Sequence, residues 1–353
     1  MRRMKRLLAI TMGDPTGVGP EIIARAWSDR SLHAQVRMVV LGHPEIMRRA
    51  IRLVRGSARV VEVTSVEAAD SSLEQLPCLQ CSDDRVVAVP PRTLHPLGGQ
   101  AAYEAVTMAT GLAQAGRVDG IVTAPLNKAA LAAAGHAYPG HTELLADLCG
   151  VDEVAMMLYL GPSELVRGPA GLGVAHATLH MALRDIFTSL TPERIVRTAR
   201  LAHVVTHCLL DATPAPAAPR IGVCALNPHA GEQALFGDEE ERIIRPAVTH
   251  AADAGMDVSG PFPADTLLAR ATAGEFDAVV AMYHDQGHIA LKLLGMHRAV
   301  NITLGLPVIR TSVAHGTAFD LAGTGQARCD SMIEAIRVAA ILIDRQSLLS
   351  WNP

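Results

Sequence analysis

The chain has 353 residues, of which 49% are hydrophobic, 19% are charged and only 3% are aromatic. This composition excludes a disordered chain and predicts a large aliphatic core, typical of parallel sheets covered by helices. The formal net charge of −4 provides no broad basic surface, so we expect neither a nucleic-acid nor a membrane partner.

Strand-like and helical patterns alternate along most of the chain, which predicts an α/β fold with a mainly parallel sheet. The expected strands are Leu7–Thr11, Val36–Leu41, Gly120–Thr123, Val154–Leu160, Gly173–Ala177, Ile221–Leu226, Ala278–Met282 and Ala299–Leu304. The expected helices begin at Pro20 and Pro44 and cover Gly98–Gly111, Pro192–Leu210, Glu239–Ala254 and Ser331–Arg345. No run of 18 apolar residues occurs and the six cysteines are scattered, so we predict a reduced, cytoplasmic protein.

Three histidines follow expected strands, where ligands bind in such folds. His180, His229 and His284 each lie in a polar, turn-forming context after an apolar run. Three imidazoles that leave coordination positions open suit a catalytic divalent cation. From spacing alone, three separately hydrogen-bonded loop histidines are the favoured interpretation, and a metal site is the alternative.

Several residues could bind an anion. Lys292 and Arg310 are isolated cations in apolar surroundings, and such side chains are rarely buried without a partner. Each could neutralise an internal carboxylate or face a bound phosphate or carboxylate. Asn301 begins a motif that could orient a ligand. His141 and Thr142 open an expected helix, where Thr142 is either the N-cap or part of an anion site.

Two glycine-rich turns stand out, Gly13–Pro20 after the first strand and His315–Gly325 near the C-terminus. The second could wrap a nucleotide with backbone amides, or it could be a plain loop. Neither GxGxxG nor GxxxxGK[ST] occurs, so the usual dinucleotide and ATP motifs are absent. The GxSxG motif, which would indicate a hydrolase, is also absent.

An ordered series of motifs makes the pattern specific. In chain order they are GDPTGVGPE (13–21), APLNK (124–128), GHTE (140–143), NPHAGE (227–232), PADT (263–266), YHDQG (283–287), NITLGLP (301–307) and HGTA (315–318). Together they resemble the 4-hydroxythreonine-4-phosphate dehydrogenase family, which includes paralogues such as terephthalate cis-dihydrodiol dehydrogenases. The resemblance runs from the first turn to about Gly325.

The resemblance implies the two-lobed α/β/α fold of isocitrate and isopropylmalate dehydrogenases, with an active cleft between the lobes. We expect a discontinuous nucleotide-side lobe, 1–130 plus 300–353. Residues 131–299 are expected to form the metal, substrate and dimerisation lobe.

The resemblance also assigns roles to residues. His180, His229 and His284 would bind one divalent cation (Zn, Mg, Mn or Co) at a homodimer interface that shares the active site. The substrate would contact the set His141, Thr142, Lys292, Asn301 and Arg310. NAD or NADP would contact the set Gly316, Thr317 and Asp320. Lys292 and Asp285 are the candidate catalytic groups. Asp285, beside His284, could take the proton or orient a ligand, or it could be a supporting or helix-capping carboxylate.

The implied activity is metal-dependent oxidation of a secondary hydroxyl in a small anionic hydroxy acid, followed by decarboxylation. The default substrate is 4-hydroxythreonine 4-phosphate. Departures from the family pattern, including Leu179, Ala314 and His288, resemble paralogous branches. Those branches act on D-threonate or erythronate 4-phosphate, or on a dihydrodiol of an aromatic acid. The alternative to an enzyme is a catalytically inactive binding or regulatory protein that keeps the same fold.

Overall fold

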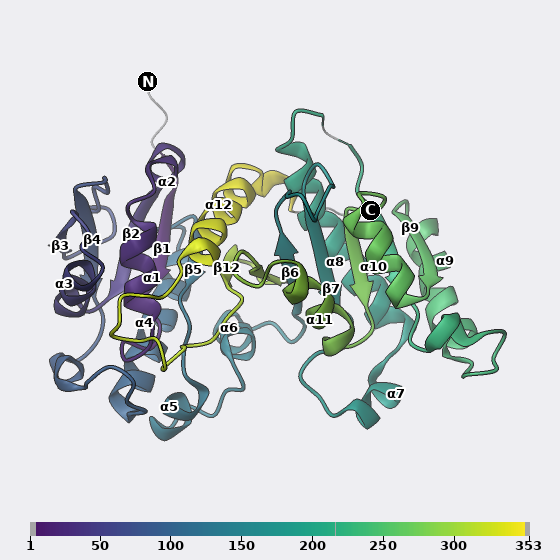
Figure 1. The fold of residues 1–353 in the computed structure, drawn as a ribbon, viewed down its shortest axis with the longest axis horizontal. Coiled ribbons are helices and arrows are strands. Elements are labelled where there is room, and N and C mark those ends of the chain that lie inside the picture. Colours follow the sequence, from purple (N-terminus) through teal and green to yellow (C-terminus); the bar gives the residue numbers. More distant parts are fainter. Residues whose placement is uncertain (1–4, 216, 350–353) are drawn as a thin grey trace. The chain divides into compact units, whose positions relative to one another are not determined.

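The computed structural model describes residues 5–215 and 217–349, which fold into two compact α/β units. The first unit contains residues 5–154 and 306–344, and the second contains the remaining described residues. Figure 1 shows that each unit has its own strands with helices packed beside them. The expected α/β class is confirmed.

The first unit is built on a fully parallel set of strands in the order β3-β4-β2-β1-β5-β12. The strands are β1 (Leu7–Thr11), β2 (Arg37–Gly42), β3 (Arg59–Val63), β4 (Gln75–Gln80), β5 (Gly120–Thr123) and β12 (Arg310–Val313). All residues of β1 and β5 are buried, as continuous apolar runs covered on both faces should be.

Helices surround these strands and close the core. They are α1 (Gly19–Ala26), α2 (Arg30–Gln35), α3 (Pro44–Leu53), α4 (Pro96–Gln114), α5 (Lys128–Ala133), α6 (His141–Cys149) and α12 (Asp330–Asp344). Proline occupies the first turn of α1, α3 and α4, where its missing N–H costs no hydrogen bond. In one part of the core, the small residues Ala105 and Ala109 of α4 pack with Ala9 of β1 and Val39 of β2.

The second unit has the strand order β11-β6-β7-β10-β8-β9. Its strands are β6 (Ala155–Leu160), β7 (Leu172–His176), β8 (Arg220–Cys224), β9 (Asp257–Phe262), β10 (Ala278–Ala281) and β11 (Val300–Leu304). The pairs β11·β6 and β6·β7 are antiparallel, and the others are parallel. The helices are α7 (Ile186–Ser189), α8 (Pro192–Asp211), α9 (Arg245–Asp253), α10 (Ala264–Thr272) and α11 (His284–Gly295).

The expected lobe boundaries, 130/131 and 299/300, are displaced. Leu144 and Leu145 of α6 pack on Val106 of α4, so the segment up to residue 154 joins the first unit. Strand β11 pairs with β6, which keeps residues 300–305 in the second unit. After α12 the chain returns to the second unit, where Arg345 Nε donates to Asp211 Oδ2 at 3.0 Å.

Some elements differ from those expected. The continuous helix expected at Glu239–Ala254 is a π-helical turn, Glu240–Ile244, followed by α9. Pro246 stands at the start of α9, where its ring cannot continue a regular helical ladder from the preceding turn. Across residues 5–215 and 217–349, none of the helices combines the length and the apolar character that a bilayer span requires.

Candidate functional site

The three candidate metal-binding histidines follow neighbouring parallel strands. In the second unit β10 lies between β7 and β8 and is parallel to both, so their carboxyl ends meet at one edge. His180 lies in the loop after β7, His229 lies in the loop after β8, and His284 begins α11 after β10. The sheet therefore explains why residues far apart in sequence belong to one edge.

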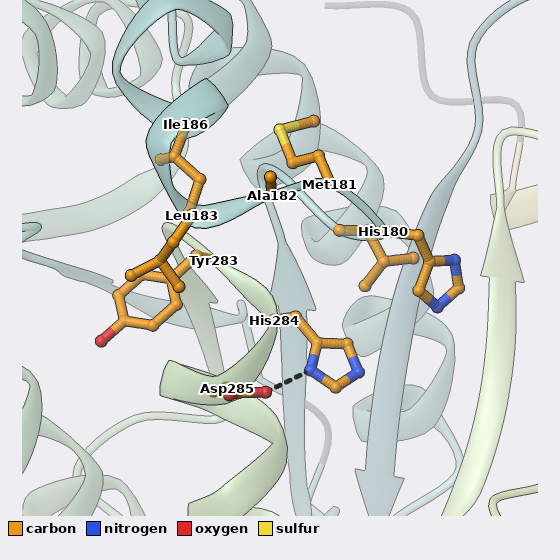
Figure 2. A pocket seen from close by; sticks show the side chains of 9 residues that line it. His180, Met181, Ala182, Leu183, Ile186, Tyr283, His284 and Asp285 are labelled. Carbon is orange, nitrogen blue, oxygen red and sulfur yellow. Dashed lines mark hydrogen bonds and ion pairs between the residues drawn. The ribbon is translucent and has the colours of Figure 1, made fainter.

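Two of these histidines share a cavity of about 490 Å³, lined by the loop 179–186 and by Tyr283, His284 and Asp285. The ring centroids of His180 and His284 are 5.9 Å apart. His284 Nδ1 lies 2.6 Å from Asp285 Oδ1. Figure 2 shows this contact and both imidazoles on the same side of the pocket. Because the carboxylate accepts a hydrogen bond from Nδ1–H, Nε2 of His284 carries the lone pair, which is the usual arrangement of a metal-binding histidine.

A second pair of histidines packs against His284. Burial lowers the pKa of His176 to about 4 and that of His288 to about 2, so both rings are neutral near pH 7. The carbonyl of Met156 can only accept, so His176 Nδ1 donates to it (3.2 Å) and Nε2 accepts from His288 Nδ1 (3.0 Å). The His288 ring stacks on His284 at 3.8 Å, with 13° between the planes.

Helix α11 approaches β7 closely because residue 287 is glycine. A Cβ on Gly287 would lie 2.6 Å from His176 Nε2 and 2.6 Å from a methyl group of Val174. No positive φ is involved, so the requirement is steric rather than conformational. The glycine of the YHDQG motif therefore permits the histidine packing that supports His284.

His229 is exposed on a strained loop. Six consecutive residues, 229–234, have φ angles between 43° and 80°, and five of them are not glycine. Such conformations cost free energy in L-residues. The base of the loop is fixed by the buried carboxylate of Glu240, whose Oε1 accepts the N–H groups of Leu226 and Asn227, both at 2.8 Å.

His229 does not complete a metal site within one chain. Among the described residues no three His, Cys, Asp or Glu side chains are grouped closely enough to hold a metal ion. The structure thus brings together His180 and His284, whereas His229 has Phe236 as its ring neighbour, at 6.3 Å between centroids.

Backbone strain in this loop predicts a stability gain from Ala234→Gly. Ala234 is exposed with φ 70°, and glycine removes the Cβ penalty of about 1–2 kcal/mol. Part of that gain is offset by the greater entropy of the unfolded glycine chain, so we expect a net rise of about 1 kcal/mol in unfolding free energy. Chemical denaturation measures it. The control Ala269→Gly, on the exposed side of α10, should destabilise by about 1 kcal/mol. A loss in both variants would contradict the strain.

Two further substrate candidates belong to the second unit. Lys292 is half-buried on α11, four and eight residues after His288 and His284, and thus on the same face of the helix. Asn301 lies in β11, and its Oδ1 is buried without a hydrogen-bond partner in the parts of the chain that the structure describes. An unsatisfied amide oxygen is costly unless a ligand donates to it.

A buried cationic cluster in the first unit contains the other candidates. Arg310 begins β12, is only 1% exposed, and donates from Nη2 to Thr123 Oγ1 at 2.6 Å. Burial lowers its pKa to about 9, while the charge of Glu143 acts in the opposite direction. Burial and the nearby charge of Arg310 hold the pKa of His141 well below its usual value. The buried guanidinium of Arg310, with the neutral imidazole of His141 beside it, would favour the binding of an anion.

Helix α6 does not begin as expected if Thr142 were its N-cap. The N-cap is Gly140, with no side-chain cap, and Thr142 is a buried residue of the first turn. Thr142 therefore does not cap this helix. His141 Nε2 is buried and has no hydrogen-bond partner within residues 5–215 and 217–349.

The second glycine-rich turn runs from the end of β12 towards α12. Gly316 and Asp320 are exposed and Thr317 is half-buried, and a Cβ on Gly316 would meet no atom within 4 Å. The expected cofactor residues thus lie on an accessible turn. A separate cavity of about 260 Å³ lies between the first turn, α3 and Gly323.

The sequence did not indicate several residues of these sites. His176 and His288 resemble ordinary core histidines in sequence, and only tertiary packing reveals their contact with His284. Glu143 lies in the GHTE motif and Thr123 directly precedes the APLNK motif. The hydrogen bond of Thr123 to Arg310 depends on the pairing of β12 with β5, and the electrostatic effect of Glu143 on Arg310 depends on the packing of α6.

Comparison with known proteins identifies the family. The family model described as pyridoxal phosphate biosynthetic protein PdxA matches residues 34–339. A D-threonate 4-phosphate dehydrogenase from Cupriavidus necator is 45% identical, over 97% of this chain and 98% of its own. A 4-hydroxythreonine-4-phosphate dehydrogenase from Geobacter metallireducens is also 45% identical, over 96% of each.

Solved structures agree with this assignment. A 4-hydroxythreonine-4-phosphate dehydrogenase from Klebsiella pneumoniae is 41% identical, with a TM-score of 0.82 over 97% of this chain and 99% of that one. A terephthalate 1,2-cis-dihydrodiol dehydrogenase from Burkholderia xenovorans is 31% identical, with a TM-score of 0.64 over 96% and 98% of the two chains. The chain therefore belongs to the PdxA family of pyridoxal phosphate biosynthetic proteins.

Proposed function

We propose that this protein is a cytoplasmic, NAD(P)-dependent and divalent-metal-dependent dehydrogenase that oxidises and decarboxylates a phosphorylated four-carbon hydroxy acid. The observation that carries the proposal is the pocket in which His180 faces His284 while Asp285 orients the His284 ring. Its donor set fits a divalent cation, because imidazole side chains are typical ligands of Zn²⁺ and similar ions. Such a cation would polarise the substrate hydroxyl and favour its ionisation.

We assign the third ligand, His229, to the second copy in a homodimer. Within one chain His229 is exposed and lies outside the His180–His284 pair. The second unit also exposes large apolar side chains on α11 and beside both histidine loops. They are Leu183 (64%), Phe187 (54%), Leu235 (72%), Phe236 (48%), Ile289 (58%), Leu293 (82%) and Met296 (46%). Such a concentration suits burial against a second copy, which would bring its own His229.

The chain's own charges support an anionic substrate. Arg310, with His141 and Thr142 beside it in the first unit, would bind one anionic group, and Lys292 and Asn301 would bind other polar groups. A hydroxyl oxidation releases one proton and one hydride. Asp285 would accept the proton, a bound nicotinamide cofactor would supply the hydride acceptor, and Lys292 would return a proton to carbon after CO₂ leaves.

The turn carrying Gly316, Thr317 and Asp320 is the proposed cofactor site. Its exposed backbone and lack of a GxGxxG motif suit a nucleotide held by turn amides rather than by the usual dinucleotide motif. NAD is the default, and NADP is an outcome of the assay.

The relatives favour a phosphorylated substrate. The relatives named for D-threonate 4-phosphate and for 4-hydroxythreonine 4-phosphate are each 45% identical, against 31% for the dihydrodiol dehydrogenase. The two phosphorylated acids share a carboxylate, a secondary hydroxyl at C3 and a phosphate at C4. They differ at C2, which carries a hydroxyl in one and an amino group in the other.

Reduction of NAD⁺ measured with each phosphorylated acid and with terephthalate dihydrodiol tests the proposal. We expect kcat/KM to be at least about tenfold higher for a phosphorylated acid, because a lost charged hydrogen bond costs about 1.5–3 kcal/mol. Chelation should abolish turnover, and a divalent cation should restore it. A preference for the dihydrodiol would overturn the substrate class. No turnover with any substrate in metal-supplemented buffer would favour an inactive binding protein.

A further inference from the structure

The two glycine-rich turns of the sequence are joined by a set of contacts that the proposed chemistry does not use. Glu21 lies in the first turn of α1 and is only 3% exposed. Its two carboxylate oxygens accept the backbone N–H groups of Gly323 and Gly325, the latter at 2.9 Å. Arg25, one helical turn later, donates to the carbonyl of Gly325.

These contacts are not ordinary helix capping. An acidic residue in a first turn commonly interacts with the N–H groups of its own helix. Here the capping residue is Val18, with no side-chain cap, and the Glu21 carboxylate instead binds amides about 300 residues later in the chain. The helix therefore directs its buried acid to a distant turn.

Further contacts hold the same turn. Val18 N–H donates to the carbonyl of Thr317 at 3.0 Å, and Arg92 Nε donates to the carbonyl of Ala322 at 2.8 Å. A Cβ on Gly17 would lie 2.9 Å from the Thr317 side chain, so the two turns are in close contact. Contacts at 317, 322, 323 and 325 thus fix most of the length of the turn.

We propose that Glu21 and Arg25 are positioning residues that hold the 316–325 turn in the conformation that binds the cofactor. This inference rests on the proposed use of NAD by that turn. Gly323 and Gly325 have φ angles of 77° and 67°. Glycine adopts positive and negative φ angles about equally readily, so its own preference does not hold the turn in this conformation. Without an acceptor for their amides, the turn can populate other shapes, and the cofactor must then select a fraction of them.

Substitution of Glu21 by Gln tests this role. The amide keeps the size of the side chain but replaces one acceptor oxygen with an NH₂ group that opposes a backbone N–H. We expect KM for NAD⁺ to rise about tenfold or more, with kcat at saturating cofactor and KM for the substrate nearly unchanged. Exchange of the Gly323 and Gly325 amide hydrogens in the cofactor-free protein should accelerate.

Two companion variants keep the result interpretable. Arg25→Met should raise KM for NAD⁺ in the same direction, which provides a second test if Glu21→Gln folds poorly. Glu67→Gln is the control, because Glu67 is an exposed carboxylate of the same unit that also accepts two hydrogen bonds, from Arg117 at 2.7 and 2.8 Å. It should leave KM and amide exchange in the turn unchanged.

The outcomes separate this inference from the proposed function. If the unmodified enzyme reduces NAD⁺ but Glu21→Gln and Arg25→Met leave KM for NAD⁺ and amide exchange unchanged, the positioning role is wrong. If the unmodified enzyme neither binds nor reduces NAD⁺, the cofactor proposal fails, and the positioning role, which rests on it, fails with it.

Discussion

Mixing two inactive variants, His229→Ala and His284→Ala, should restore activity to about a quarter of that of the unmodified enzyme. Each variant alone should be inactive, because every site then lacks one metal ligand. In a mixed dimer one site combines the intact His180 and His284 of the first chain with the intact His229 of the second. Random exchange makes about half of the dimers mixed, and each has one of two sites intact. Activity after co-refolding or co-expression measures this.

The matched control is a mixture of His180→Ala and His284→Ala. These two histidines share one pocket within one chain, so every site in a mixed dimer lacks one of them and no activity should return. All three residues are exposed or only half-buried, so the substitutions should leave the fold intact by circular dichroism. Activity in the control mixture, or none in the first mixture, would contradict a site shared between two copies.

The fold could be predicted where apolar runs were long and bounded by turns. Strands such as β1 and β10 are fully buried, and their sequences are continuous aliphatic runs. The missed strands lack that signal. β3 interrupts its valines with Glu62, β4 contains Pro77, β9 contains Gly260 and Pro261, and three of the four residues of β12 are polar. Proline and glycine argue against a strand when only local propensity is considered.

The placement of the candidate histidines after strands could be predicted from the sequence, but the contacts around them could not. Placement after strands indicated His180, His229 and His284, since parallel strands align their carboxyl ends. Sequence could not show that His229 lies apart from the other two within one chain, because that depends on the loop conformation after β8. The roles of His288 and Glu21 were likewise hidden, since their partners His176, Gly323 and Gly325 are distant in sequence.

Replacing Arg310 by Met should strongly weaken binding of the phosphorylated substrate. Burial of a guanidinium that is 1% exposed carries a desolvation cost, which the charge of Glu143 opposes and a bound anion would offset further. Loss of a charge-assisted hydrogen bond of about 1.5–3 kcal/mol corresponds to a rise in KM of about 10- to 150-fold. Steady-state kinetics at saturating NAD⁺ measures it, with thermal unfolding as the check that the variant folds.

Companion variants distinguish anion binding from a purely structural role. Arg310→Lys keeps a positive charge but loses the planar fork that donates to Thr123, so its KM should lie between those of the unmodified enzyme and Arg310→Met. Arg117→Met removes an exposed arginine of the same unit and should leave KM unchanged. If Arg310→Met weakened an uncharged analogue as much as the phosphorylated acid, the guanidinium would be supporting β12 and its pairing with β5 rather than binding the substrate.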